Sequence, residues 1–191
     1  MQVAGPKPHQ WTREEFYQLL DLGMFQGRRV ELIEGEILEM PAQKNFHLAA
    51  ICLGADALRA AFGPGFWVRA QGSLDLSPLS TPDPDLAVVQ GSPRTASPAN
   101  PTTALLIAEV SDTTLAYDRQ TKGSLYARAG IADYWIVNLV DRQLEVYRIP
   151  VSDSSQRYGF RYADQVILQA GAFVAPLAAP HARVAVADLL P

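Results

Sequence analysis

The chain has 191 residues, of which 48% are hydrophobic and 19% are charged, so it predicts one folded domain over residues 1–191 rather than a disordered segment. Its net charge of −4 disfavours a protein that holds nucleic acid by bulk charge, although a bound cation reverses the local sign of a carboxylate site. A single cysteine, Cys52, excludes an intrachain disulfide and a cysteine-based zinc site. With no secretory signal and no membrane-spanning stretch in the sequence, we expect a cytoplasmic protein.

The predicted elements mix helices and short strands. Thr12 and Glu15 form a capping box before the first helix, and Glu34-Gly35 predicts the turn of a hairpin. The nearly unbroken apolar run at residues 104–110 predicts a strand covered on both faces. The predicted helices are 13–22, 45–62 and 117–129, and the predicted strands are 28–33, 36–40, 66–70, 73–76, 86–90, 104–110, 133–138 and 143–149, with further strands and loops in 157–190.

This order predicts an α/β (α+β) fold with a mixed sheet and antiparallel hairpins. It lacks the strict β–α–β alternation of a doubly wound fold. The sequence also lacks the glycine-rich, P-loop and nucleophile-elbow motifs, so nucleotide binding and serine hydrolysis have no motif support.

Two carboxylates lie at the ends of predicted buried strands. Glu109 interrupts the apolar run at 104–110, where burying an unpaired carboxylate is costly, and Asp85 directly precedes the apolar run at 86–89. A hard divalent cation such as Mg²⁺ takes one or two carboxylates and completes its shell with water and substrate phosphate. The alternatives are a strand-end Glu109 that reaches solvent or an arginine, and an Asp85 that only shapes a turn beside proline.

Lys122 lies on the helix predicted to follow the Glu109 strand. Asp118, Lys122 and Tyr126 recur every four residues and so share one helical face. An exposed ion pair between Asp118 and Lys122 accounts for this spacing. The alternative is that Lys122 turns back towards Glu109, because the helix begins close to the end of that strand.

Five stretches of the sequence, in this order, resemble motifs of one bacterial family. They are residues 30–36, 84–89 and 107–111, then Asp118 with Lys122 and Tyr126, and finally residues 130–137. The sequence is similar over residues 11–147 to the Uma-type (Uma two) restriction-endonuclease-like family of the PD-(D/E)XK nuclease superfamily. The resemblance implies a restriction-endonuclease-like mixed β-sheet flanked by helices.

The resemblance also assigns roles to individual residues. Asp85 matches the aspartate of the PD-(D/E)XK motif, and Glu109 matches its second acidic residue. Ser111 occupies the usual place of the lysine, and the family's pattern moves that role to Lys122. Asp85, Glu109 and the backbone carbonyl of Val110 would then hold Mg²⁺ or Mn²⁺.

Two further residues match positions that the family favours. Glu31 is interpreted as an outer metal ligand or, with more weight, as the partner of a strand salt bridge. His47, near the start of a predicted helix, is interpreted as an accessory site residue or as a structural histidine, with the structural role favoured.

The implied function is metal-dependent endonucleolytic hydrolysis of DNA, with DNA as the partner by resemblance alone. Two alternatives stay open: a catalytically silent nuclease-fold scaffold for binding or oligomerisation, which the acidic charge and Ser111 favour, and a metal-dependent hydrolase of another substrate. A homodimer or larger homo-oligomer is also among the expected assemblies. A nuclease should place basic side chains near its carboxylates; the candidates are Arg28, Arg29, Arg69 and Arg119.

Overall fold

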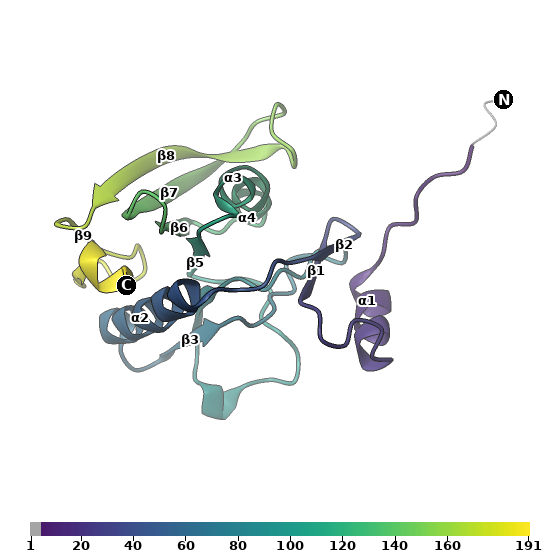
Figure 1. Ribbon diagram of the computed structural model, residues 1–191, viewed down its shortest axis with the longest axis horizontal. Coiled ribbons are helices and arrows are strands. Elements are labelled where there is room, and N and C mark those ends of the chain that lie inside the picture. The colour runs from purple at the N-terminus through teal and green to yellow at the C-terminus, as the bar shows by residue number, and fades with distance from the viewer. Residues whose placement is uncertain (1–4) are drawn as a thin grey trace.

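A six-stranded mixed sheet forms the centre of the computed structural model, which describes residues 5–191 (Figure 1). The strand order is β3-β4-β5-β6-β7-β8; β5 and β6 run parallel, and the other neighbours pair antiparallel. The strands are β3 (Phe66–Ala70), β4 (Leu86–Gln90), β5 (Leu106–Ser111), β6 (Asp133–Asn138), β7 (Gln143–Ser152) and β8 (Phe160–Gln169).

Helices cover both faces of this sheet. On one face lies α2 (Asn45–Phe62), whose buried residues Ala50, Ile51, Ala55, Leu58 and Phe62 recur at helical spacing. The other face is covered by α3 (Leu115–Tyr117), a π-helical segment (Asp118–Lys122) and α4 (Gly123–Arg128). Every residue of β5 is buried, as a strand between two layers requires, so the sequence pattern at 104–110 predicted its environment correctly.

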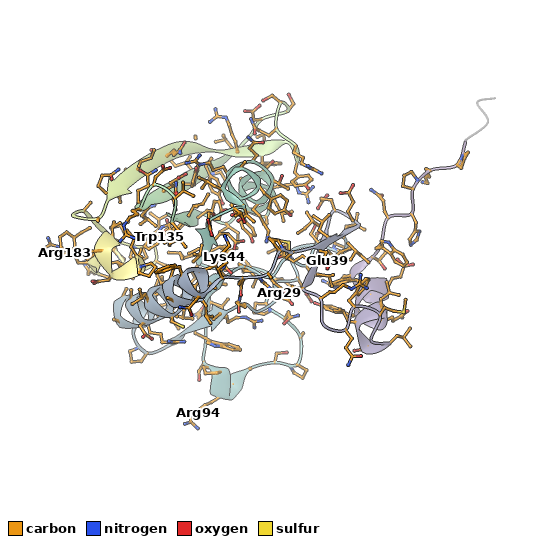
Figure 2. All side chains as sticks on the ribbon, viewed as in Figure 1. Arg29, Glu39, Lys44, Arg94, Trp135 and Arg183 are labelled. Atoms are coloured by element: carbon orange, nitrogen blue, oxygen red, sulfur yellow. The ribbon has the colours of Figure 1, made fainter. Side chains whose placement is uncertain are left out.

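Short elements at both ends of the chain complete the fold. The N-terminal part holds α1 (Arg13–Asp21) and the hairpin of β1 (Val30–Ile33) and β2 (Glu36–Glu39), which lie to one side of the sheet in Figure 1. The C-terminal part holds β9 (Phe173–Val174), β10 (Val184–Ala185) and a 3₁₀ turn (Val186–Leu189), which pack with α2. Trp135 of β6, labelled in Figure 2, is only 1% exposed and belongs to the hydrophobic cluster that α2 and these C-terminal elements form with the sheet.

The structure corrects two predicted elements. Residues 73–76 form no strand: Leu74 N donates to Pro82 O and Asp75 N donates to Pro101 O, so this segment is held by irregular loop contacts. Its apolar alternation reflects the burial of Leu74 against the core rather than pairing in a sheet. The predicted helix at 117–129 starts earlier and contains the π-helical segment. Across residues 5–191, every helix is too short or too polar to span a lipid bilayer.

The capping box of α1 has both of its reciprocal bonds. Glu15 N donates to Thr12 Oγ1 at 3.2 Å, and Thr12 N donates to Glu15 Oε2 at 2.8 Å. We expect Thr12→Ala to lower the free energy of unfolding by about 1 kcal/mol, because one amide of the first turn loses its acceptor. Urea denaturation measures this loss, and Thr12→Ser, which keeps the hydroxyl, should stay near the wild type. An equal loss in both variants would contradict the capping role.

Candidate functional site

A cavity of about 60 Å³ lies where α2, the β1–β2 hairpin, β4, β5 and the π-helical segment meet. One buried water needs about 10–15 Å³ of such space, so a cation with some of its hydration shell fits. Six acidic and three basic side chains line this cavity: Glu31, Asp83, Asp85, Glu109, Asp112 and Asp118, and Arg29, Lys44 and Lys122. The structure therefore brings together all six residues named from the sequence, since His47 and Val110 line the same cavity.

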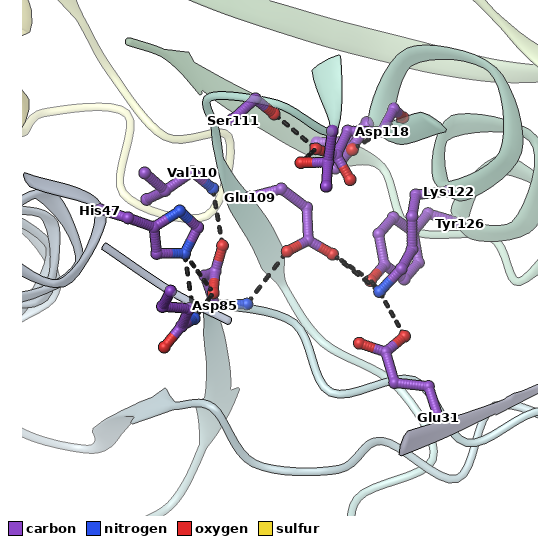
Figure 3. A network of polar contacts seen from close by, with 12 residues as sticks. Glu31, His47, Asp85, Glu109, Val110, Ser111, Asp118, Lys122 and Tyr126 are labelled. Atoms are coloured by element: carbon purple, nitrogen blue, oxygen red, sulfur yellow. Dashed lines mark hydrogen bonds and ion pairs between the residues drawn. The ribbon is translucent and has the colours of Figure 1, made fainter. Parts of the chain in front are cut away.

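Asp85 and Glu109 lie beside each other because β4 and β5 pair antiparallel. Leu86 is opposite Ala108, so Asp85, which precedes Leu86, lies opposite Glu109, which follows Ala108. Asp85 N donates to Glu109 Oε2 at 3.1 Å, and Val110 N donates to Asp85 Oδ2 at 2.9 Å. Figure 3 shows Glu109 directed at the amide of Asp85, and the Asp85 carboxylate held by Val110 and His47. Asp85 and Glu109 are only 6% and 4% exposed.

Lys122 and Tyr126 hold the other oxygen of Glu109. Lys122 Nζ lies 3.3 Å from Glu109 Oε1, and the Tyr126 hydroxyl donates to the same oxygen at 2.6 Å. Lys122 Nζ also lies 2.6 Å from Glu31 Oε2, so one buried ammonium is shared by two carboxylates (Figure 3). Glu31 is thus a salt-bridge partner of Lys122 across the layers of the fold.

His47 and Gln43 hold the far oxygen of Asp85. His47 Nε2 and Gln43 Nε2 each lie 3.2 Å from Asp85 Oδ1. His47 comes from the first turn of α2, and Gln43 comes from the loop before that helix. His47 therefore contacts the carboxylate of Asp85 and helps to fix its orientation.

Asp118 does not pair with Lys122, so the exposed ion pair considered from the sequence is wrong. Its Oδ2 instead accepts hydrogen bonds from Ser111 Oγ at 2.6 Å and from Thr114 Oγ1 at 2.7 Å. Both Asp118 and Lys122 are buried. The serine found at the usual lysine position of the motif therefore helps to fix the start of the π-helical segment.

Arg119 anchors the same π-helical segment to the sheet. Its Nε donates to Glu145 Oε2 at 2.9 Å, and a second bond joins its Nη2 to Glu145 Oε1. Asn138 Nδ2 and the Tyr147 hydroxyl also donate to the carboxylate of Glu145. These bonds set the rotation of the segment that carries Lys122.

Burial and crowding change the proton affinity of the acidic residues. Burial raises the pKa of Glu109 to about 8; Lys122 opposes this rise, whereas Asp85 and Asp118 add to it. Burial likewise raises the pKa of Glu31 and of Asp118 above their usual values. Burial disfavours the charge on Lys122, but Glu109 and Glu31 outweigh it and hold the pKa of the lysine well above its usual value. The site therefore combines the charged ammonium of Lys122 with carboxylates whose ionised forms a further positive charge would stabilise.

Asp85 and Glu109 each keep one carboxylate oxygen with unused capacity to accept a bond. Within residues 5–191, no group of three or more His, Cys, Asp or Glu side chains is placed to hold a metal ion. In that range Asp85 Oδ2 accepts only from Val110 N, and Glu109 Oε2 accepts only from Asp85 N. A carboxylate oxygen accepts two bonds, so each keeps one lone pair for a hard cation that takes its other ligands from water and phosphate.

Of the four arginines expected near the carboxylates, Arg29 alone lines this cavity. Arg28 pairs with Glu39 at 3.6 Å, and Arg119 is held by Glu145. Arg69 lies in a separate pocket, with its guanidinium over the ring of Trp67. The basic surface expected for a nuclease is therefore small at this site.

Comparisons with known proteins agree with the fold and the motifs. The structure of "a putative nuclease belonging to DUF820 from Anabaena variabilis ATCC 29413" aligns with a TM-score of 0.68 and 18% identity, over 93% of this chain and 96% of that chain. At this identity the likeness shows a shared fold, which confirms the predicted fold class. No match was found among curated proteins. The family model Uma2, described as "Putative restriction endonuclease", matches residues 13–186, and the chain therefore belongs to this nuclease-like family.

Proposed function

We propose that this protein is a divalent-cation-dependent nuclease that hydrolyses phosphodiester bonds of DNA. The observation that carries the proposal is the pairing of Asp85 with Glu109 in one cavity, with Lys122 on the far oxygen of Glu109. The nuclease-like family and fold support the same assignment. Two carboxylate oxygens that keep a free lone pair, Asp85 Oδ2 and Glu109 Oε2, support the proposed dependence on a cation.

Asp85 Oδ2, Glu109 Oε2 and the carbonyl of Val110 are the atoms that would hold Mg²⁺ or Mn²⁺. When bound, such a cation polarises a phosphate and lowers the pKa of water at the site. Tyr126 and Lys122 occupy Glu109 Oε1, which leaves Oε2 turned towards Asp85. Lys122 also presents a fixed positive charge that orients the attacking water or offsets the charge that develops on the phosphate.

We expect DNA binding, and not only cleavage, to require the cation. Acidic side chains outnumber basic ones around the cavity, so the metal-free site repels a phosphate. The purified protein should cleave plasmid DNA with MgCl₂ or MnCl₂ and leave it intact in EDTA. It should also bind a fluorescein-labelled duplex in CaCl₂ and release it in EDTA, as measured by anisotropy. Cleavage that persists in EDTA would contradict the metal assignment.

A catalytically silent nuclease-fold binding scaffold is the second candidate. The observations that favour it are the excess of acidic side chains in the cavity and the use of Ser111 to hold Asp118. A folded protein that binds MnCl₂ but cleaves neither single-stranded nor duplex DNA with any divalent cation would make this the better assignment.

A further inference from the structure

Arg29 points into the cavity because of the register of the N-terminal hairpin. Arg29 O accepts from Met40 N at 2.8 Å, which extends the β1–β2 pairing by one residue beyond Val30 and Glu39. Side chains two residues apart on an extended strand point the same way, so Arg29 and Glu31 share one side. Both line the cavity, and Figure 2 shows Arg29 where the hairpin meets the start of α2, which Lys44 marks.

The charge of Arg29 has no structural partner within residues 5–191. The other two cations of the cavity are engaged: Lys122 with Glu31 and Glu109, and Lys44 with Asp112 at 3.4 Å. Arg29 makes no ion pair and no side-chain hydrogen bond in that part of the chain, although it is half-buried. The five N–H donors of its guanidinium are therefore free for a ligand in the cavity.

We propose that Arg29 binds the non-bridging oxygens of the substrate phosphodiester, and so is a substrate-binding residue of the site. This inference rests on the proposed nuclease function. A planar guanidinium matches two phosphate oxygens at once, whereas the acidic groups around it repel that phosphate until a cation offsets them. Arg29 then supplies the positive charge that is free to contact the phosphate.

The competing explanation is that Arg29 only offsets the charge of the acidic residues. Burial raises the pKa of Glu31 and Asp83, and the charge of Arg29 opposes that rise in both. The two roles differ in the stability of the metal-free protein. If Arg29 only offsets buried acidic charge, its loss lowers thermal stability, because the carboxylates lose a favourable interaction. If Arg29 binds substrate, its loss weakens DNA binding while thermal stability and metal binding are maintained.

The test compares Arg29→Ala and Arg29→Gln with the matched control Arg28→Ala, which removes the neighbouring arginine that pairs with Glu39 outside the cavity. Anisotropy of a labelled DNA duplex in CaCl₂ is measured over a series of KCl concentrations, and MnCl₂ binding without DNA is measured by electron paramagnetic resonance. Both Arg29 variants should lose about ten-fold or more in DNA affinity. Their salt slope should fall by about 0.9, as expected for one lost phosphate contact.

In the same experiment, Mn²⁺ affinity should be unchanged or higher in both Arg29 variants, and Arg28→Ala should match the wild type throughout. DNA affinity equal to the wild type in both Arg29 variants overturns the inference, while cleavage by the wild type leaves the proposed function standing. Parallel loss of DNA binding, Mn²⁺ binding and thermal stability in both variants also overturns it, because that pattern marks a structural role. A wild type that neither binds nor cleaves DNA with any divalent cation overturns the proposed function together with the inference.

Discussion

Asp85→Asn and Glu109→Gln should each lower the rate of metal-dependent DNA cleavage by about 100-fold or more. Each change removes a negative charge from the pair that would hold the cation, a loss worth several kcal/mol in the transition state. The amides keep the shape of the side chains and one oxygen that accepts a hydrogen bond. Alanine is less informative at Glu109, because it would also strip Lys122, Tyr126 and the Asp85 amide of an acceptor. Cleavage rates at saturating MgCl₂ measure the effect.

Asp112→Asn is the matched control for these two variants. Asp112 lines the same cavity and loses the same charge, but its only ion pair within residues 5–191 is with the exposed Lys44. We expect its cleavage rate to stay within about three-fold of the wild type, since an exposed pair is worth about 1 kcal/mol or less. Cleavage that survives both Asp85→Asn and Glu109→Gln, or that falls equally in all three variants, would remove Asp85 and Glu109 from the metal site.

Lys122→Met should lower the free energy of unfolding by about 3–5 kcal/mol. It removes the ammonium that Glu31 and Glu109 share and leaves two buried carboxylates without their cation. Adding Glu31→Gln to this variant should recover part of the loss, because one of the two carboxylates is then neutral. Urea unfolding in EDTA measures both variants.

Two controls separate this effect from a general loss of surface charge. Lys44→Met, whose side chain is 71% exposed, should cost less than about 1 kcal/mol. The loss in Lys122→Met should also grow as the pH rises. Burial raises the pKa of Glu109 from its usual 4.5 to about 8 in the folded protein, and Lys122 opposes this rise. Without Lys122 the pKa of the folded acid rises further, so the variant loses more stability than the wild type as the pH climbs above about 8. Equal losses in the two lysine variants would contradict the buried ion pairs.

Local sequence pattern was sufficient to place Asp85 and Glu109. Each carboxylate adjoins an apolar run that becomes a buried strand, and antiparallel pairing of those strands brings the two residues together. The failed strand at 73–76 marks the limit of this approach. Leu74 is buried in an irregular loop, and alternation alone does not distinguish such burial from pairing in a sheet.

The surroundings of Lys122 depend on tertiary structure that periodicity does not predict. Helical spacing placed Asp118, Lys122 and Tyr126 on one face. In the structure, which is π-helical here, Asp118 accepts a hydrogen bond from Ser111, whereas Lys122 and Tyr126 both contact Glu109. Arg119 stabilises that segment through Glu145, a residue 26 positions away. No local signal in the sequence reports such a contact.

The contact between Glu31 and Lys122 also determines when a growing chain acquires its site. Glu31, Asp85 and Glu109 are synthesised before Lys122. Glu31 and Glu109 therefore leave the ribosome before the ammonium with which both of them pair. The N-terminal hairpin cannot form this ion pair with the sheet until the segment that carries Lys122 has been made and packed. An incomplete chain that ends before residue 122 therefore lacks the lysine of the proposed catalytic centre, so the proposed nuclease activity requires a chain that extends past this residue.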